Sequence, residues 1–246
     1  MQTIFDLLDI NFLAALIVSI VAGLIRGFAG VGSGMLMAPI FILLFGPVET
    51  VAMIILIEIV TTIQLIPGVY KEIDWRAIWP MGIAAIFFMP VGSWLLVTVD
   101  TETMSRAIAA IVLVFSIILL AGWRFKGNKR TSTTAAVGSL SGTMMAATSL
   151  GNPPVMLYLL SSQDSAATNR ANFTGYFAIT LTSLILWMTI RGLITPIPVL
   201  RAGLLLPAFL ITAYIGSKLF RKSSERLYRR LTLSLLICVG IYGLIR

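Results

Sequence analysis

The sequence predicts an all-α, polytopic membrane protein built as an inverted repeat of two five-segment halves. Of the 246 residues, 58% are hydrophobic and 11% are charged, whereas soluble domains carry roughly 45–50% apolar and about 25% charged residues. The mean hydropathy is +0.98. The apolar residues gather into ten segments, and similar glycine-rich turns occur in both halves of the chain. An ordinary soluble enzyme and a disordered protein are excluded by this composition.

The ten segments run over residues 11–29, 35–46, 48–69, 77–99, 104–123, 135–149, 154–160, 171–190, 196–217 and 231–245. A helix needs about 20 residues to cross the hydrocarbon core, and most segments approach or exceed that length. As helices, segments 35–46 and 154–160 would reach only about 18 Å and about 11 Å, against a core of roughly 30 Å. Short re-entrant or broken helices are therefore expected at these two places.

Basic residues orient the loops. The linker over residues 124–131 contains four basic residues and no acid, and residues 218–230 contain six basic residues and one acid. Both are expected on the cytoplasmic side. Arg191 and Arg201 depart from this preference of basic residues for the cytoplasmic side, because they are expected in a loop on the other side. An even number of crossings must separate the two basic regions, so segments 135–149 and 154–160 are expected to form a hairpin.

The chain divides into two related halves, residues 1–123 and 132–246, on either side of the basic linker. Gly23 and Gly32 are nine positions apart, as are Gly142 and Gly151. An odd number of segments in each half predicts that the halves are inverted relative to each other. Inverted repeats are typical of secondary transporters, in which one repeat rocks against the other around a site near the midplane.

The two glycine-rich turns are the predicted binding site. Gly32, Ser33 and Gly34 precede one short segment, and Gly151, Asn152 and Pro153 precede the other. A helix that begins inside the membrane leaves N–H groups without partners, and its positive dipole end attracts anions. Ser33 and Asn152 are suitable N-caps, and Pro153 suits a first helical position. The alternative is that the glycines only allow close helix packing, as is expected for Gly23 and Gly27.

Five further side chains belong to the candidate site or lie near it. Glu58 is the one acid deep in a segment, where a carboxylate is costly and marks a functional site. Glu58 is expected to carry a coupling proton, to pair with Arg170 or Arg26, or to face a pore. Gln64, two helical turns further on, is a candidate gating residue. Arg170 either attracts the anion or lies at the interface, Arg26 is expected to snorkel, and Tyr176 offers a hydroxyl to the substrate.

Several classes of chemistry find no support in the sequence. The chain has no His and one Cys, Cys238, so histidine-dependent catalysis and a metal site are not predicted. The glycines match neither the dinucleotide-binding nor the P-loop pattern, and no cofactor is expected. The net charge is +8, and the basic residues lie between the apolar runs. This placement is typical of residues that orient a membrane protein, so no nucleic acid is expected as a partner. The protein is not expected to be an enzyme.

The stretches GFAGVGSGMLMAP and SGTMMAATSLGNPPVMLYLL resemble the TauE/SafE family of sulfite exporters, also called the toluene-sulfonate uptake permease family. The resemblance extends over nearly the whole chain. Ser33 and Asn152 stand where the family often has glycine. The resemblance implies a transporter of sulfite, thiosulfate or an organosulfonate.

Together, the residues and the resemblance predict a multi-pass transporter of a small sulfur-containing anion in the cell membrane, in a bacterium the inner membrane. The anion is expected between the two turns, and its other partners are the lipid bilayer and a coupling proton. A passive anion channel is the alternative, because a channel also needs an anion site. No oligomeric state is predicted.

Overall fold

The computed structural model describes residues 9–29, 32–121, 130–159 and 166–220, together with residues 237 and 241. These residues form nine α-helices and one 3-10 turn, and no strand occurs among them. The chain divides into two compact units, each assembled from both halves of the sequence. The first unit is Met1–Ile57, Asp100–Ala121 and Ile194–Arg246, and the second is Glu58–Val99 and Gly122–Leu193.

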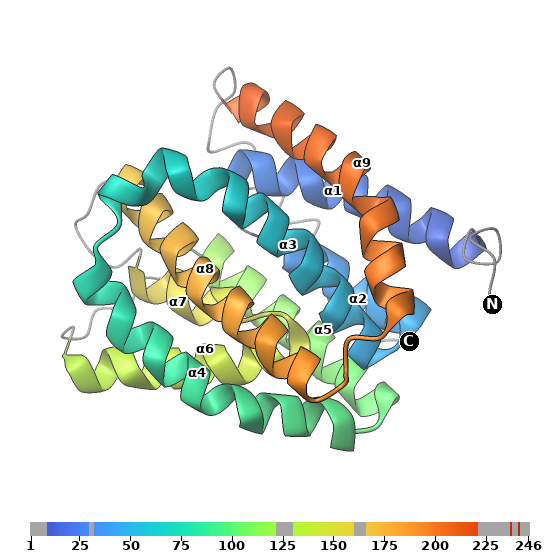
Figure 1. Ribbon diagram of the computed structural model, residues 1–246, viewed down its shortest axis with the longest axis horizontal. Helices are drawn as coiled ribbons and strands as arrows, with labels where there is room; N and C mark the ends of the chain where they lie inside the picture. The colour runs from blue at the N-terminus through green and yellow to red at the C-terminus, as the bar shows by residue number, and fades with distance from the viewer. Residues whose placement is uncertain are drawn as a thin grey trace. The chain divides into compact units, whose positions relative to one another are not determined.

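The first unit is organised around the pairing of its earliest and latest described helices. It contains α1 (Ile10–Ala29), α2 (Ser33–Phe45), the beginning of α3 (Pro47–Val69), α5 (Thr101–Leu120) and α9 (Pro196–Phe220). In Figure 1, α1 in blue runs alongside α9 in orange and red. The short α2 packs against α1 and α5. A helix from each half of the sequence thus forms the main contact of this unit.

The second unit repeats this plan with the roles of the halves exchanged. It contains the rest of α3, the 3-10 turn η2 (Tyr70–Glu72), α4 (Trp75–Thr98), α6 (Thr131–Thr148), α7 (Asn152–Leu159) and α8 (Ala166–Ile190). The pairing of α4 with α6 is its main contact, and α8 also packs on α4 (Figure 1). The short α7 contacts both α6 and α8.

Side-chain caps fix where three of the long helices begin. Asp9 precedes α1 and accepts a hydrogen bond from the N–H of Phe12 at 2.8 Å. Asp74 precedes α4 and accepts hydrogen bonds from the N–H groups of Arg76 at 3.1 Å and Ala77 at 3.3 Å. Asp100 precedes α5 and accepts from the N–H of Thr103 at 2.9 Å. Hydrogen bonding from Thr103 also lowers the pKa of the exposed Asp100 carboxyl below its ordinary value. Such capping satisfies N–H groups that have no partner inside the helix.

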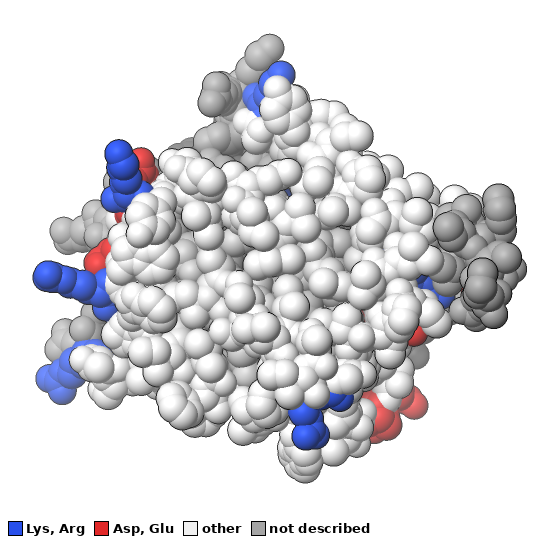
Figure 2. Space-filling model, viewed as in Figure 1, with Lys and Arg blue, Asp and Glu red and all other residues white. Residues whose placement is uncertain are grey.

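Every predicted segment within the described residues is a helix, and the bounds agree within about five residues. Within the described ranges, six helices are long and apolar enough to cross a membrane: α1, α3 with η2, α4, α5, α8 and α9. The predicted shortness of α2 and α7 is confirmed, at 13 and 8 residues. On the face shown in Figure 2, residues other than Lys, Arg, Asp and Glu make up most of the surface. The predicted segment 231–245 and most of the basic linker lie outside the described residues.

Glycines bring the paired helices into backbone contact. In the first unit, a Cβ on Gly23 would lie 2.5 Å from the carbonyl oxygen of Phe209, and one on Gly216 would lie 2.3 Å from that of Leu24. Gly27 meets the backbone of Ala213 in the same way. The interpretation of Gly23 and Gly27 as close-packing residues is confirmed. No larger residue fits these positions unless α1 and α9 move apart.

The crossing of α4 and α6 in the second unit has the same construction. A Cβ on Gly142 would lie 2.2 Å from the carbonyl oxygen of Ala85, and one on Gly92 would lie 2.1 Å from that of Thr143. The two crossings correspond residue by residue when the halves are aligned on their glycines. The corresponding pairs are Gly23–Phe209 with Gly142–Ala85, and Gly216–Leu24 with Gly92–Thr143. The first helix of each half therefore crosses the fourth helix of the other half.

Candidate functional site

The turn between α6 and α7 lies buried in the second unit. The helix α6 ends at Ser149, whose backbone is left-handed (φ 61°, ψ 11°) and whose N–H donates to the carbonyl of Met145 at 2.9 Å. Leu150 and Gly151 follow, both buried, and α7 begins at Asn152. The left-handed residue ends α6 and lets the chain enter α7 within three residues.

A chain of hydroxyl groups fixes the orientation of the Gly151 carbonyl. The Tyr176 hydroxyl on α8 donates to Ser141 Oγ on α6 at 2.7 Å, and Ser141 Oγ donates to the carbonyl oxygen of Gly151. All three residues are buried. Because a trans peptide directs its C=O and N–H in opposite directions, this contact turns the N–H of Asn152 away from Ser141. Tyr176 therefore contacts the turn indirectly, through its hydrogen bond to Ser141.

Close packing on α6 also fixes the turn. A Cβ on Gly151 would lie 2.7 Å from Met145 Cβ and 2.8 Å from the carbonyl oxygen of Ser141, so only glycine fits without a shift. Further along α7, the hydroxyls of Tyr158 and Thr134 are 2.5 Å apart. The short helix is therefore held to α6 at both of its ends.

The first turn of α7 offers few backbone donors. Pro153 and Pro154 have no N–H group, so two of the four positions that ordinarily lack an intrahelical partner carry no donor. Pro153 is the second residue of α7, not the first as predicted, and it is buried. Asn152 is the first residue of α7, so the prediction that it is the N-cap is wrong. Its side chain lies outside the described residues, as does that of Arg170, the fifth residue of α8. An anion at this helix end would need donors besides the backbone.

The corresponding turn of the first unit precedes α2 and differs in its cap. Gly32 is the N-cap, with a left-handed backbone (φ 99°, ψ −9°) and no side chain to bond the helix. The prediction that Ser33 is the N-cap is wrong, because glycine adopts this conformation readily and Ser33 becomes the first helical residue. Ser33 and Gly34 are both buried. No proline occupies the first turn of α2, so its first three residues retain their N–H groups.

The predicted coupling and gating residues lie on α3 in different environments. Glu58 is 4% exposed, whereas Gln64 is exposed. The hydroxyl of Thr62 donates to the backbone carbonyl of Glu58 at 2.8 Å. Arg26 on α1 is 2% exposed, so the expectation that its side chain snorkels to the surface is wrong. Glu58 and Arg26 are thus charged residues buried within the protein.

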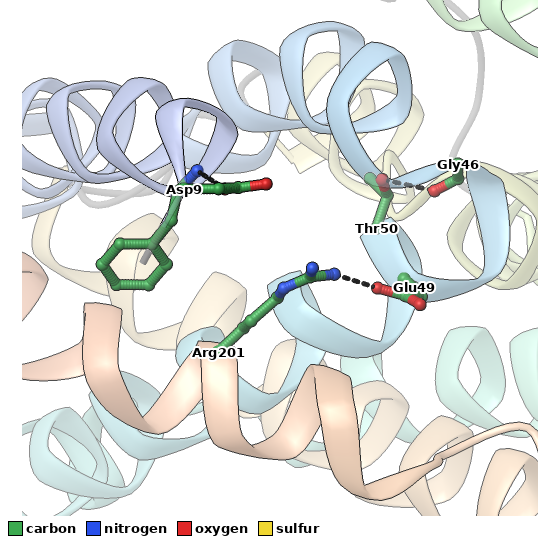
Figure 3. Close-up of polar contacts among 6 residues, drawn as sticks. Asp9, Gly46, Glu49, Thr50 and Arg201 are labelled. Carbon is green, nitrogen blue, oxygen red and sulfur yellow. Dashed lines mark hydrogen bonds and ion pairs between the residues drawn. The ribbon is translucent and has the colours of Figure 1, made fainter. Parts of the chain in front are cut away.

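An ion pair that the sequence did not predict joins α9 to α3 in the first unit. Arg201 Nη1 lies 2.6 Å from Glu49 Oε2, and the Arg201 guanidinium lies 4.5 Å from the centre of the Phe45 ring. Figure 3 shows Arg201 reaching from its helix towards Glu49, beside the Thr50–Gly46 hydrogen bond. The expectation that Arg201 lies in a loop is wrong, because α9 already begins at Pro196. The ion pair supplies the partner that this charge needs in an apolar setting.

A second polar contact links the two halves in the second unit. The N–H of Asp74, just before α4, donates to Oδ1 of Asn172 on α8 at 2.7 Å, and Asn172 is 2% exposed. No group of three or more metal-binding side chains occurs in the part of the chain that the structure describes. The polar chemistry of the candidate turns there consists of backbone groups and hydroxyls.

The long apolar helices and the two short helices define a multi-pass α-helical membrane protein. More particularly, the chain belongs to the sulfite exporter TauE/SafE family, whose sequence model matches residues 15–243. The resemblance noted at the two turns is thereby confirmed. The family identifies the chain as a membrane transporter of anions and not as an enzyme. Neither a curated protein nor a solved structure is matched by the chain.

Proposed function

We propose that this protein is a secondary transporter that carries a small sulfur-containing anion, such as sulfite, thiosulfate or an organosulfonate, across the cell membrane. In a bacterium this is the inner membrane. The anion is bound at the turns that precede α2 and α7. The observation that carries the proposal is the buried turn at Gly151, which begins a helix too short to cross a bilayer and is held in place by hydroxyl groups.

The two helix starts contribute to anion binding in different ways. Both present the positive end of a helix dipole. The start of α2 supplies the N–H groups of Ser33 and Gly34 beside a cap without a side chain, so a ligand can approach the backbone closely. The start of α7 has prolines at two of these positions, so the Asn152 side chain is proposed as a donor there. Arg170 attracts the anion, in keeping with its residue type.

Tyr176 acts at the site through Ser141. Because Ser141 engages the Gly151 carbonyl, that carbonyl is turned towards α6, which reduces repulsion of a bound anion. The Tyr176 hydroxyl donates to Ser141, and this bond orients the serine hydroxyl towards Gly151. Tyr176 and Ser141 are therefore proposed as positioning residues for the turn.

Glu58 is proposed to carry the coupling proton, and Gln64 to take part in gating. Glu58 is buried on α3, and the chain belongs to a transporter family. A carboxylate inside the membrane commonly serves ion coupling. A pH gradient should then drive uphill accumulation of the anion in proteoliposomes, and Glu58→Gln should abolish that accumulation while leaving binding intact. Uphill accumulation is also what a passive channel cannot produce. Movement that only ever follows the anion gradient would support the channel.

The direct test is a thermal-shift titration of the purified protein with sulfite, thiosulfate, sulfoacetate, taurine, sulfate, chloride and acetate. A ligand at 100 times its Kd stabilises the folded state by about 2.7 kcal/mol, so a selective sulfur anion should raise the melting temperature clearly. Asn152→Leu should remove this shift without lowering the melting temperature of the protein alone. If no sulfur anion stabilises the wild-type protein, the proposed substrate class is wrong.

A further inference from the structure

One residue in the turn before α7 combines an unfavourable backbone with an unused hydroxyl. Ser149 is the one non-glycine residue with positive φ in the part of the chain that the structure describes. Side chains other than Gly, Asn and Asp rarely occupy this conformation. Helix ends of this kind usually have glycine. A serine here suggests that its side chain has a function at this position.

The Ser149 hydroxyl is buried without a partner. Ser149 is 3% exposed, and its Oγ has no hydrogen bond within the described part of the chain. The hydroxyl of the preceding residue is engaged: Thr148 Oγ1 donates to the Met144 carbonyl at 2.7 Å and accepts from the N–H of Leu150 at 3.2 Å. Since buried hydroxyls are normally hydrogen-bonded, the Ser149 hydroxyl is available to a ligand.

In the part of the chain that the structure describes, two other buried serine hydroxyls have no hydrogen-bond partner, but their setting differs. Ser19 and Ser116 lie inside α1 and α5. A serine inside a helix can rotate its hydroxyl towards the carbonyl four residues earlier. Ser149 has a left-handed backbone (φ 61°, ψ 11°), so the geometry by which a serine inside a helix reaches that carbonyl does not apply to it. The unused donor at Ser149 therefore has no such local alternative.

Two N–H donors are missing from the start of α7, and a hydroxyl group can donate in their place. Pro153 and Pro154 remove two N–H groups from its first turn, so an anion there finds fewer backbone donors than at α2. Ser149 is three residues from Asn152, so their Cα atoms are at most about 11 Å apart. An ion with several oxygens, held by two hydrogen bonds of about 2.8 Å each, spans much of that distance.

We propose that the Ser149 hydroxyl is a substrate ligand, which donates a hydrogen bond to one oxygen of a sulfur oxyanion bound at the N-terminus of α7. This inference rests on the proposed function and adds a residue that determines affinity at the same site. The ligand class is an anion with two or more oxygens on one sulfur atom, because one oxygen faces the helix start while another accepts from Ser149. The left-handed backbone holds the serine in the turn itself.

The test measures the Kd of sulfite, thiosulfate and taurine for the detergent-purified full chain by calorimetry. In Ser149→Ala, the Kd of every anion that the wild type binds should rise about 10-fold or more, since a hydrogen bond to a charged group corresponds to about 10- to 100-fold in binding. Ser116→Ala, which removes another buried, unpartnered serine hydroxyl, should leave the Kd unchanged.

A second variant separates ligand binding from folding. Ser149→Gly removes the hydroxyl but suits the left-handed backbone, so its melting temperature should equal or exceed that of the wild type while its Kd rises as in Ser149→Ala. If the serine were purely structural, Ser149→Gly would lower the melting temperature and leave the Kd unchanged. Unchanged Kd values in both Ser149 variants would overturn the inference and leave the proposed function standing. Absence of binding by the wild type would instead overturn the proposed function.

Discussion

The glycine at the α4–α6 crossing predicts a large effect from adding one methyl group. In Gly142→Ala the new Cβ would lie 2.2 Å from the carbonyl oxygen of Ala85, whereas real Cβ atoms stay beyond 3.0 Å, so the helices must separate by at least 0.8 Å. Overpacking of this kind costs roughly 1–3 kcal/mol, and the contact is with backbone, which cannot rotate away. Alanine regains about 1 kcal/mol through helix propensity, so a net loss of up to about 2 kcal/mol is expected.

Gly203→Ala is the matched control, because a Cβ at Gly203 in α9 meets nothing within 4 Å. It should gain about 0.5–1 kcal/mol from propensity alone. For a chain of this size, 1 kcal/mol shifts the melting temperature by roughly 2–4 °C, so the two variants should differ by several degrees in thermal unfolding in detergent. Equal melting temperatures for Gly142→Ala and Gly203→Ala would refute the backbone contact.

Three further predictions concern the polar contacts. A double-mutant cycle on Arg201 and Glu49 should give a coupling energy of about 1 kcal/mol in thermal unfolding, because the pair is partly exposed; no coupling would contradict the ion pair. Tyr176→Phe should weaken anion binding several-fold in calorimetry with little loss of stability, and an unchanged Kd would remove its positioning role. In a Cys238→Ser background, joining Glu49→Cys to Arg201→Cys with a bis-maleimide should leave transport in proteoliposomes intact. Loss of transport on cross-linking would show that α3 and α9 must separate.

The helices could be predicted from the sequence because the thickness of a bilayer sets the length that an apolar segment needs to cross it. An apolar run that can cross must be near 20 residues, and the ends of such runs are marked by polar or charged residues. The shortness of α2 and α7 followed from the same arithmetic. The cap of α2 did not, because residue type alone favoured Ser33, whereas the fold uses the left-handed freedom of Gly32. Cap position depends on the path of the chain, which hydropathy does not encode.

The contacts of the site were beyond sequence reasoning for a different reason. Tyr176 and Ser141 are 35 positions apart, and Arg201 and Glu49 are 152 apart. No periodicity links positions on different helices. The turn itself was predicted from its glycines, and the role of Ser149 had one available signal, a serine at the end of the predicted segment 135–149 and two residues before Gly151. That signal becomes informative only once the backbone conformation and burial are known.

The exchange of helices between the halves bears on how such a transporter can move. Gly23 and Gly142 each hold the first helix of one half against the fourth helix of the other half through backbone contact. A half that rocked as a rigid body would have to break both crossings at once, and both would have to re-form with the same tight fit. Bodies assembled from both halves, as the compact units are, keep each crossing intact. We therefore predict that one sequence half does not rock against the other as a rigid body, and the α3–α9 cross-link tests this because it joins Glu49 of the first half to Arg201 of the second.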